Sequence, residues 1–133
     1  MSPPFVLSPQ PPVVGAEQYV YGGVQLVRVI DGDTCVLRFP LPFNTSRDLD
    51  VRLLGINAPE SVGASRAAGL AARAHLAALL EGAQGLIARS HRTERYGRYL
   101  AELWVRRDGV WRNVSLALLE AGMAVPYDGG ART

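Results

Sequence analysis

The chain has 133 residues, a length typical of one domain, and 48% of them are hydrophobic, which excludes an intrinsically disordered chain. Its formal net charge is only +2, so charge by itself does not indicate a nucleic-acid partner. The single cysteine, Cys35, excludes an internal disulfide, and its apolar neighbours favour a small buried side chain over a nucleophile.

The N-terminal segment, residues 1–17, is rich in proline and lacks hydrophobic periodicity, which predicts an extended arm. No stretch of the sequence approaches the roughly 20 apolar residues of a membrane span. The prolines, and the absence of a basic residue before Arg28, argue against a signal peptide. If Met1 is the native start, we expect a cytoplasmic or phage-encoded protein that does not contact a membrane.

Strand patterns follow the arm. Residues 18–30 predict a strand with a kink at a glycine pair, and strand residues resume at 34–39 after a short Asp-Gly-Asp turn. Prolines and polar residues predict a loop at 40–46. Residues 51–54 predict a third strand, which ends at Gly55. The short turns favour an antiparallel meander of three strands.

The second half of the sequence mixes helices and strands. Residues 65–81 have a helical period and predict an alanine-rich helix. Residues 86–90 and 99–105 predict two paired strands. A last helix is predicted over 113–121, with Asn113 as its N-cap.

The predicted order is three strands, a helix, two strands and a helix, which is the order of an OB-fold. We therefore expect a mainly β structure with α-helices (α+β), built as a five-stranded OB-fold barrel with two or three helices. The expected organisation is an N-terminal arm (1–17), one folded domain (18–128) and a C-terminal tail (129–133).

Several polar residues stand at strand ends, where a site could form. Asp31 and Asp33 could hold a hard cation between them, although Asp-Gly-Asp is also an ordinary turn sequence. Arg52 lies inside an apolar strand, where it either faces solvent or, if half-buried, requires an anion such as phosphate. Glu60 follows that strand, and Arg98 begins a later one. Taken singly, each is better explained as a surface residue.

Three sequence blocks in combination resemble the staphylococcal nuclease (thermonuclease) family. They are residues 29–34 (VIDGDT), 51–60 (VRLLGINAPE) and 92–98 (RTERYGR), with a weaker fourth block over 113–124. Each block is weak alone, but the blocks follow the family's order, and that combination is specific.

The resemblance implies a metal-dependent endonuclease that hydrolyses phosphodiester bonds of DNA, RNA or both with little sequence specificity. It implies a preference for single strands, and products with 5′-hydroxyl and 3′-phosphate ends. Arg52 and Arg98 match the arginines that contact the scissile phosphate, and Glu60 matches the general base. The positions implied to contact the nucleotide are Arg95, Tyr96 and, through a looser match, Tyr127.

The implied cofactor is one Ca²⁺ ion, bound by Asp33, Asn57 and the main-chain carbonyl of Ala58. Asn57 stands where the family usually has a second aspartate, so one negative charge is missing. Because calcium affinity depends on the charge of the ligands, we expect weak Ca²⁺ binding and reduced activity. Asp31 could partly compensate if its carboxylate turns toward the ion.

An alternative interpretation is that the fold serves as a catalytically inactive module that binds nucleic acid or protein, with Asn57 marking the loss of activity. The presence of Arg52, Glu60 and Arg98 favours the enzyme. We expect a monomer, and the sequence identifies no protein partner.

Overall fold

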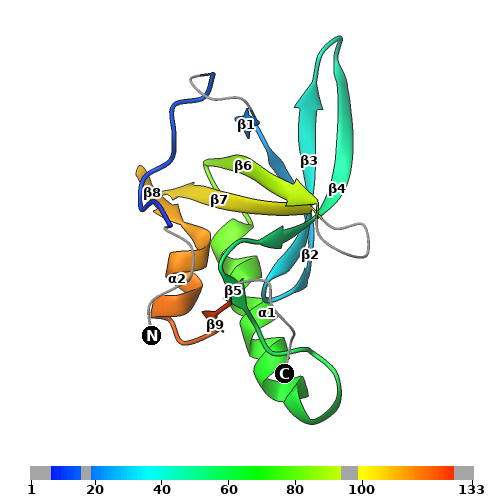
Figure 1. Cartoon of the computed structure of the whole chain (residues 1–133), viewed down its shortest axis with the longest axis vertical. Helices are drawn as coiled ribbons and strands as arrows, with labels where there is room; N and C mark the ends of the chain where they lie inside the picture. The colour runs from blue at the N-terminus through cyan, green and yellow to red at the C-terminus, as the bar shows by residue number, and fades with distance from the viewer. Residues whose placement is uncertain (1–6, 16–18, 94–98, 128–133) are drawn as a thin grey trace.

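The computed structural model describes residues 7–15, 19–93 and 99–127. The described part is mainly β with two α-helices, which confirms the predicted α+β class (Figure 1). In chain order the elements are β1 (Val20–Tyr21), β2 (Gln25–Asp31), β3 (Thr34–Leu41), β4 (Thr45–Leu53), β5 (Ile56–Asn57), a 3₁₀ turn (Gly63–Ser65), α1 (Arg66–Leu80), β6 (Gly85–Thr93), β7 (Tyr99–Arg107), β8 (Val110–Asn113), α2 (Val114–Glu120) and β9 (Val125–Pro126).

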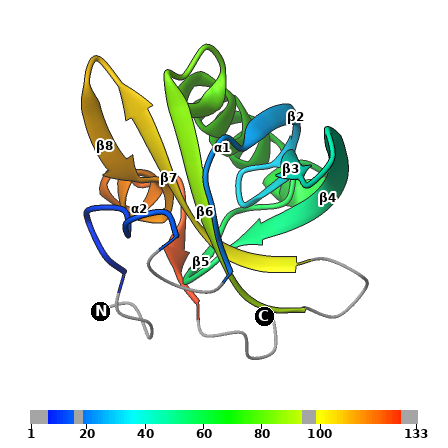
Figure 2. The ribbon, with the colours of Figure 1, turned by 90° about the horizontal axis from the view of Figure 1, so that it is seen from above.

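The strands form one large sheet in the order β1-β6-β7-β4-β3-β2, with β8 paired to β7, and β5 pairs separately with β9. Among the described pairs, only β4 and β7 run parallel. Figure 2 shows β6, β7 and β8 from above. Within the described residues the hydrogen-bonded path does not return from β2 to β6, so the closed five-stranded barrel stays a prediction.

The predicted strand over 18–30 is divided into β1 and β2, because residues 22–24 break the pairing and Gly23 has a φ of 66°. The loop predicted at 40–46 is wrong: β3 and β4 continue through most of it as a hairpin. Pro40 is tolerated there because the pairing of β2 with β3 begins at Arg38, so the outer side of β3 has no partner strand beyond that point in the described sheet. The short strands β5, β8 and β9 are too brief to show alternation in the sequence.

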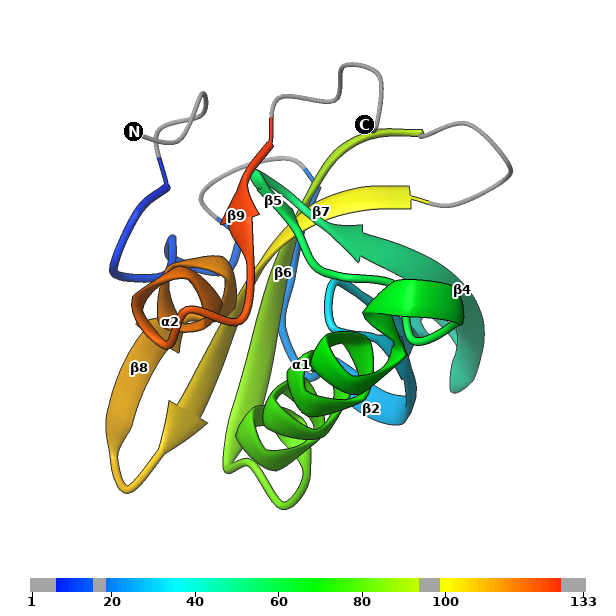
Figure 3. The ribbon, with the colours of Figure 1, turned by 90° about the horizontal axis from the view of Figure 1, so that it is seen from below.

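Both predicted helices are confirmed within a residue or two. Helix α1 buries one face along its length and packs on β2, and Asn113 caps α2 by accepting a hydrogen bond from the Leu116 N–H at 3.2 Å. The two helices lie side by side beneath the sheet (Figure 3).

Cys35 is completely buried in the core, and burial raises the pKa of its thiol to about 12, so it is an inert core residue as expected. No helix in the described residues is long and apolar enough to cross a membrane.

Candidate active site

Strands β3 and β4 place Asp33 and Arg52 side by side. Arg52 is the register partner of Thr34, and the Leu53 N–H donates to the carbonyl of Asp33 at 2.9 Å. Both charged residues are buried, with Asp33 3% and Arg52 2% exposed. Asp33 Oδ2 lies 3.7 Å from Arg52 Nη2, so the two form a buried ion pair.

Asp33 also holds the loop that follows β5. Its Oδ2 accepts a hydrogen bond from the main-chain N–H of Ala58 at 2.8 Å, and its Oδ1 accepts one from the Thr34 hydroxyl at 2.9 Å. These bonds stabilise the ionised carboxylate and fix its orientation. The contact of Ala58 with Asp33 is therefore made through its N–H group.

Arg52 is surrounded by oxygen acceptors and one aromatic ring. Its Nη2 donates to the carbonyl of Ile56 at 3.0 Å and to Asn57 Oδ1 at 3.3 Å. Its guanidinium carbon lies 4.7 Å from the centre of the Tyr127 ring. Tyr127 reaches this place because its N–H donates to the carbonyl of Gly55 at 3.0 Å, beside the pairing of β5 with β9.

Five of the residues predicted for the site therefore gather around one guanidinium or its carboxylate partner: Asp33, Arg52, Asn57, Ala58 and Tyr127. The sequence left open whether Arg52 faces solvent or requires an anion. In the structure Arg52 is buried, and its guanidinium lies beside the carboxylate of Asp33, which is an anion within the protein itself.

Three predicted residues, Arg95, Tyr96 and Arg98, lie outside the described residues. The residue that follows them, Tyr99, pairs with Val51 in the parallel ladder of β4 and β7, one residue before Arg52.

Glu60 is exposed, and its backbone is held by the beginning of α1. Its carbonyl accepts a hydrogen bond from the Ser65 hydroxyl at 2.9 Å. At Gly69 a Cβ atom would collide with the main chain of Glu60, and at Gly32 it would collide with Ala72. Small side chains thus let α1 approach the site loops closely, a packing requirement that the sequence motifs did not reveal.

Asp31 contacts the same loop. Its Oδ1 accepts a hydrogen bond from the Ser61 hydroxyl at 2.7 Å, just after Glu60 in the chain. This bond links the turn between β2 and β3 to the segment that carries Glu60.

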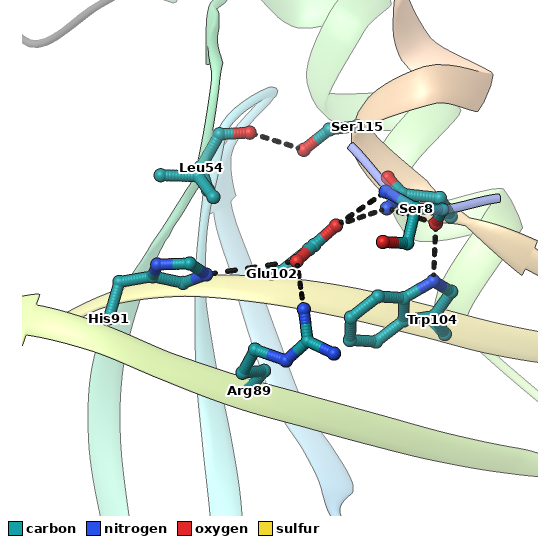
Figure 4. Close-up of polar contacts among 8 residues, drawn as sticks. Ser8, Leu54, Arg89, His91, Glu102, Trp104 and Ser115 are labelled. Carbon is teal, nitrogen blue, oxygen red and sulfur yellow. Dashed lines mark hydrogen bonds and ion pairs between the residues drawn. The ribbon is translucent and has the colours of Figure 1, made fainter. Parts of the chain in front are cut away.

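A second polar cluster centres on Glu102, which is 1% exposed in the middle of β7 (Figure 4). One carboxylate oxygen accepts hydrogen bonds from the Ser8 N–H and from Asn113 Nδ2, both at 3.0 Å. The other accepts from Arg89 Nη1 at 3.2 Å and lies 3.7 Å from His91 Nε2. The sequence signal for this cluster was a glutamate inside the apolar run 100–105, and sequence reasoning missed it.

The Glu102 cluster also binds the N-terminal arm at Ser8. The carbonyl of Ser8 accepts hydrogen bonds from Trp104 Nε1 at 2.8 Å and from Asn113 Nδ2 at 3.0 Å. The neighbouring Leu7 is buried against Leu54, close to Gly55. The described part of the arm therefore packs against the segment that follows Arg52.

The donors that could hold a metal ion at this site are oxygens: the Asp33 carboxylate, the Asn57 amide oxygen and the main-chain oxygen of Ala58. Oxygen donors are the class that Ca²⁺ binds, so the residues fit the ion in chemical type. The described residues contain no group of three or more His, Cys, Asp or Glu side chains arranged for a metal. An ion here would therefore have one carboxylate ligand and neutral oxygens.

Comparison with known proteins gives two matches. The family model described as "Staphylococcal nuclease homologue" matches residues 50–132. Protein ParB of Escherichia coli is 35% identical over 108 residues, which cover 77% of this chain and 56% of ParB, so the chain spans little more than half of that relative. The family match contains Arg52, Asn57 and Tyr127, whereas Asp33 precedes it.

Proposed function

The chain belongs to the family of staphylococcal nuclease homologues, and we propose that it hydrolyses phosphodiester bonds of DNA or RNA at the site around Arg52. The observation that carries this proposal is the convergence of Asp33, Asn57 and Tyr127 on the Arg52 guanidinium. Three elements far apart in the sequence supply these groups, and a cluster of this kind suits the recognition of an anionic backbone.

Attack on a phosphodiester builds negative charge on the phosphoryl oxygens. Two arginines, Arg52 and Arg98, would stabilise that charge more in the transition state than in the ground state. The contacts with Ile56 and Asn57 would hold the guanidinium in a fixed plane for this task.

Glu60 is the proposed general base, and its exposure leaves it accessible to water. A water molecule bonds to phosphorus, its proton passes to the Glu60 carboxylate, and the bond from phosphorus to the 5′-oxygen breaks. The 5′-oxygen takes a proton from solvent water, which gives a 5′-hydroxyl and a 3′-phosphate, and Glu60 returns its proton to solvent. The backbone contacts of Glu60 with α1 keep the loop in place during this exchange.

We propose that one Ca²⁺, held by Asp33, Asn57 and the Ala58 carbonyl, supplies further positive charge at the phosphate. Replacing Asn57 by aspartate should raise Ca²⁺ affinity about tenfold or more, because it adds a second negative ligand. Calorimetric titration of Ca²⁺ into the parent chain and Asn57→Asp measures this. Equal affinity in the two would show that Asn57 is not a ligand, and Asp50→Asn, on an exposed part of β4, is a control that should leave affinity unchanged.

One observation favours a second function, a binding module without catalysis. Arg52 is 2% exposed, and its charge is already compensated by Asp33, so it also serves as a structural ion pair. In that case the chain would bind nucleic acid or protein through its surface and leave phosphodiester bonds intact.

Incubation with labelled single-stranded DNA, in Ca²⁺ and in EDTA, separates the two functions. The nuclease should cleave the strand in Ca²⁺ only and should leave 3′-phosphate ends. Glu60→Gln should reduce the rate by about 100-fold or more, while Glu81→Gln, which alters another exposed glutamate, should not. Binding without cleavage across several divalent metals would favour the module and contradict the proposed nuclease.

A further inference from the structure

The hairpin of β3 and β4 extends well beyond the rest of the sheet (Figure 1). Residues 40–48 are all exposed, so both faces of this part of the ribbon meet solvent. Across the base of the ribbon, Arg38 donates two hydrogen bonds to Asp48, at 2.8 and 3.0 Å. At their other end, Asp33 directly precedes β3 and Arg52 lies in β4, so the hairpin is a continuous extension of the candidate site.

The tip of this hairpin carries a phenylalanine in an unfavourable conformation. Phe43 and Asn44 are the central residues of the turn, with φ values of 63° and 57°, and the Thr45 N–H donates to the Pro42 carbonyl at 3.4 Å. Two positive φ values mark a type I′ turn, in which Asn, Asp and Gly are the usual residues. A bulky side chain there is strained. Phe43 is also 96% exposed, so packing does not offset the strain.

A strained and fully exposed aromatic ring is better explained by binding than by folding. We propose that Phe43 stacks on a base of the nucleic-acid strand that is held at the Arg52 site, an inference that rests on the proposed function. Base stacking on aromatic side chains is tolerant of sequence, as a nuclease of low specificity requires. Arg47, which is also exposed and lies four residues after Phe43 on β4, would add a cation on the same ribbon for the strand's phosphates.

The length of the β3–β4 hairpin determines how long a nucleic-acid strand must be to contact both the Arg52 site and Phe43. Leu41, at the beginning of the turn, lies seven positions along β3 from Thr34, the partner of Arg52. At about 3.3 Å per residue, the tip lies roughly 25 Å from the site. A strand stacked at about 3.4 Å per nucleotide needs about seven nucleotides to span that distance. A trinucleotide at the site is therefore too short to contact Phe43.

The test compares Phe43→Asn with the parent chain and with Phe43→Tyr, all in a Glu60→Gln background that keeps the oligonucleotides intact. The probes are a trinucleotide and a single strand of about twelve nucleotides. Phe43→Asn should bind the longer strand about 5- to 100-fold more weakly and the trinucleotide unchanged. Phe43→Tyr keeps the ring and should bind both as the parent does. Because asparagine suits the turn, Phe43→Asn should also melt at an equal or higher temperature.

Three results would overturn the inference. Equal affinity of Phe43→Asn and the parent for the longer strand would show that the ring does not contact nucleic acid. A parent chain that dimerises in sedimentation, and becomes monomeric in Phe43→Asn without loss of strand affinity, would assign the tip to protein contacts. If the parent binds neither oligonucleotide, both the proposed nuclease function and this inference fail. The first two results contradict only the inference about Phe43 and leave the proposed nuclease function standing.

Discussion

Replacing Arg52 by alanine should lower the free energy of unfolding by about 3–5 kcal/mol, because it leaves the buried carboxylate of Asp33 without its counter-charge. The contacts with Asn57 and Tyr127 are lost in the same change, so the loop after β4 should also become less ordered. Urea unfolding followed by tryptophan fluorescence measures the effect.

A matched pair on the same two strands provides the control. Arg38 and Asp48 form a geometrically better ion pair, but their side chains are 47% and 41% exposed. Arg38→Ala should leave the unfolding midpoint almost unchanged, because solvent screens such a pair. Equal effects of Arg38→Ala and Arg52→Ala would contradict the description of Arg52 as a buried partner of Asp33.

Replacing Glu102 by glutamine is the second change with a large expected effect. Both oxygens of this buried carboxylate face donors, from Ser8, Asn113 and Arg89, so the amide group must direct its N–H donors toward other donors. Hydrogen bonds to charged groups contribute about 1.5–3 kcal/mol each, and we expect a loss of about 2–4 kcal/mol of unfolding free energy.

Glu102→Gln should also release the N-terminal arm, because the carboxylate accepts the Ser8 N–H. Limited proteolysis should then cut near Ser8 at protease concentrations that leave the parent intact. Glu120→Gln removes the same charge from an exposed position on α2 and should change neither stability nor proteolysis. An arm that stays protected in Glu102→Gln would show that Trp104 and Asn113 suffice to hold it.

Local sequence signals predicted the long elements well. The helical period of 65–81 and the N-cap at Asn113 are both confirmed, because each depends on neighbouring residues alone. The extension of the β3–β4 hairpin through Pro40 was missed, because it depends on where β2 stops pairing with β3, which is a property of the whole sheet.

The site was predicted from motifs rather than from periodicity. They predicted Asp33 and Arg52 as site residues, but not that Arg52 is buried and paired with Asp33, since that depends on the register of β3 with β4. The hydrogen bond between Ser8 and Glu102 joins residues 94 positions apart, and no local sequence pattern predicts such a contact.

The most direct test of the central claim is a crystal structure of the Glu60→Gln chain with Ca²⁺ and a short single-stranded DNA. We expect a backbone phosphate within hydrogen-bond distance of Arg52, and an ion about 2.3–2.6 Å from an oxygen of Asp33. A strand bound elsewhere, with Arg52 contacting only Asp33, Ile56, Asn57 and Tyr127, would contradict it.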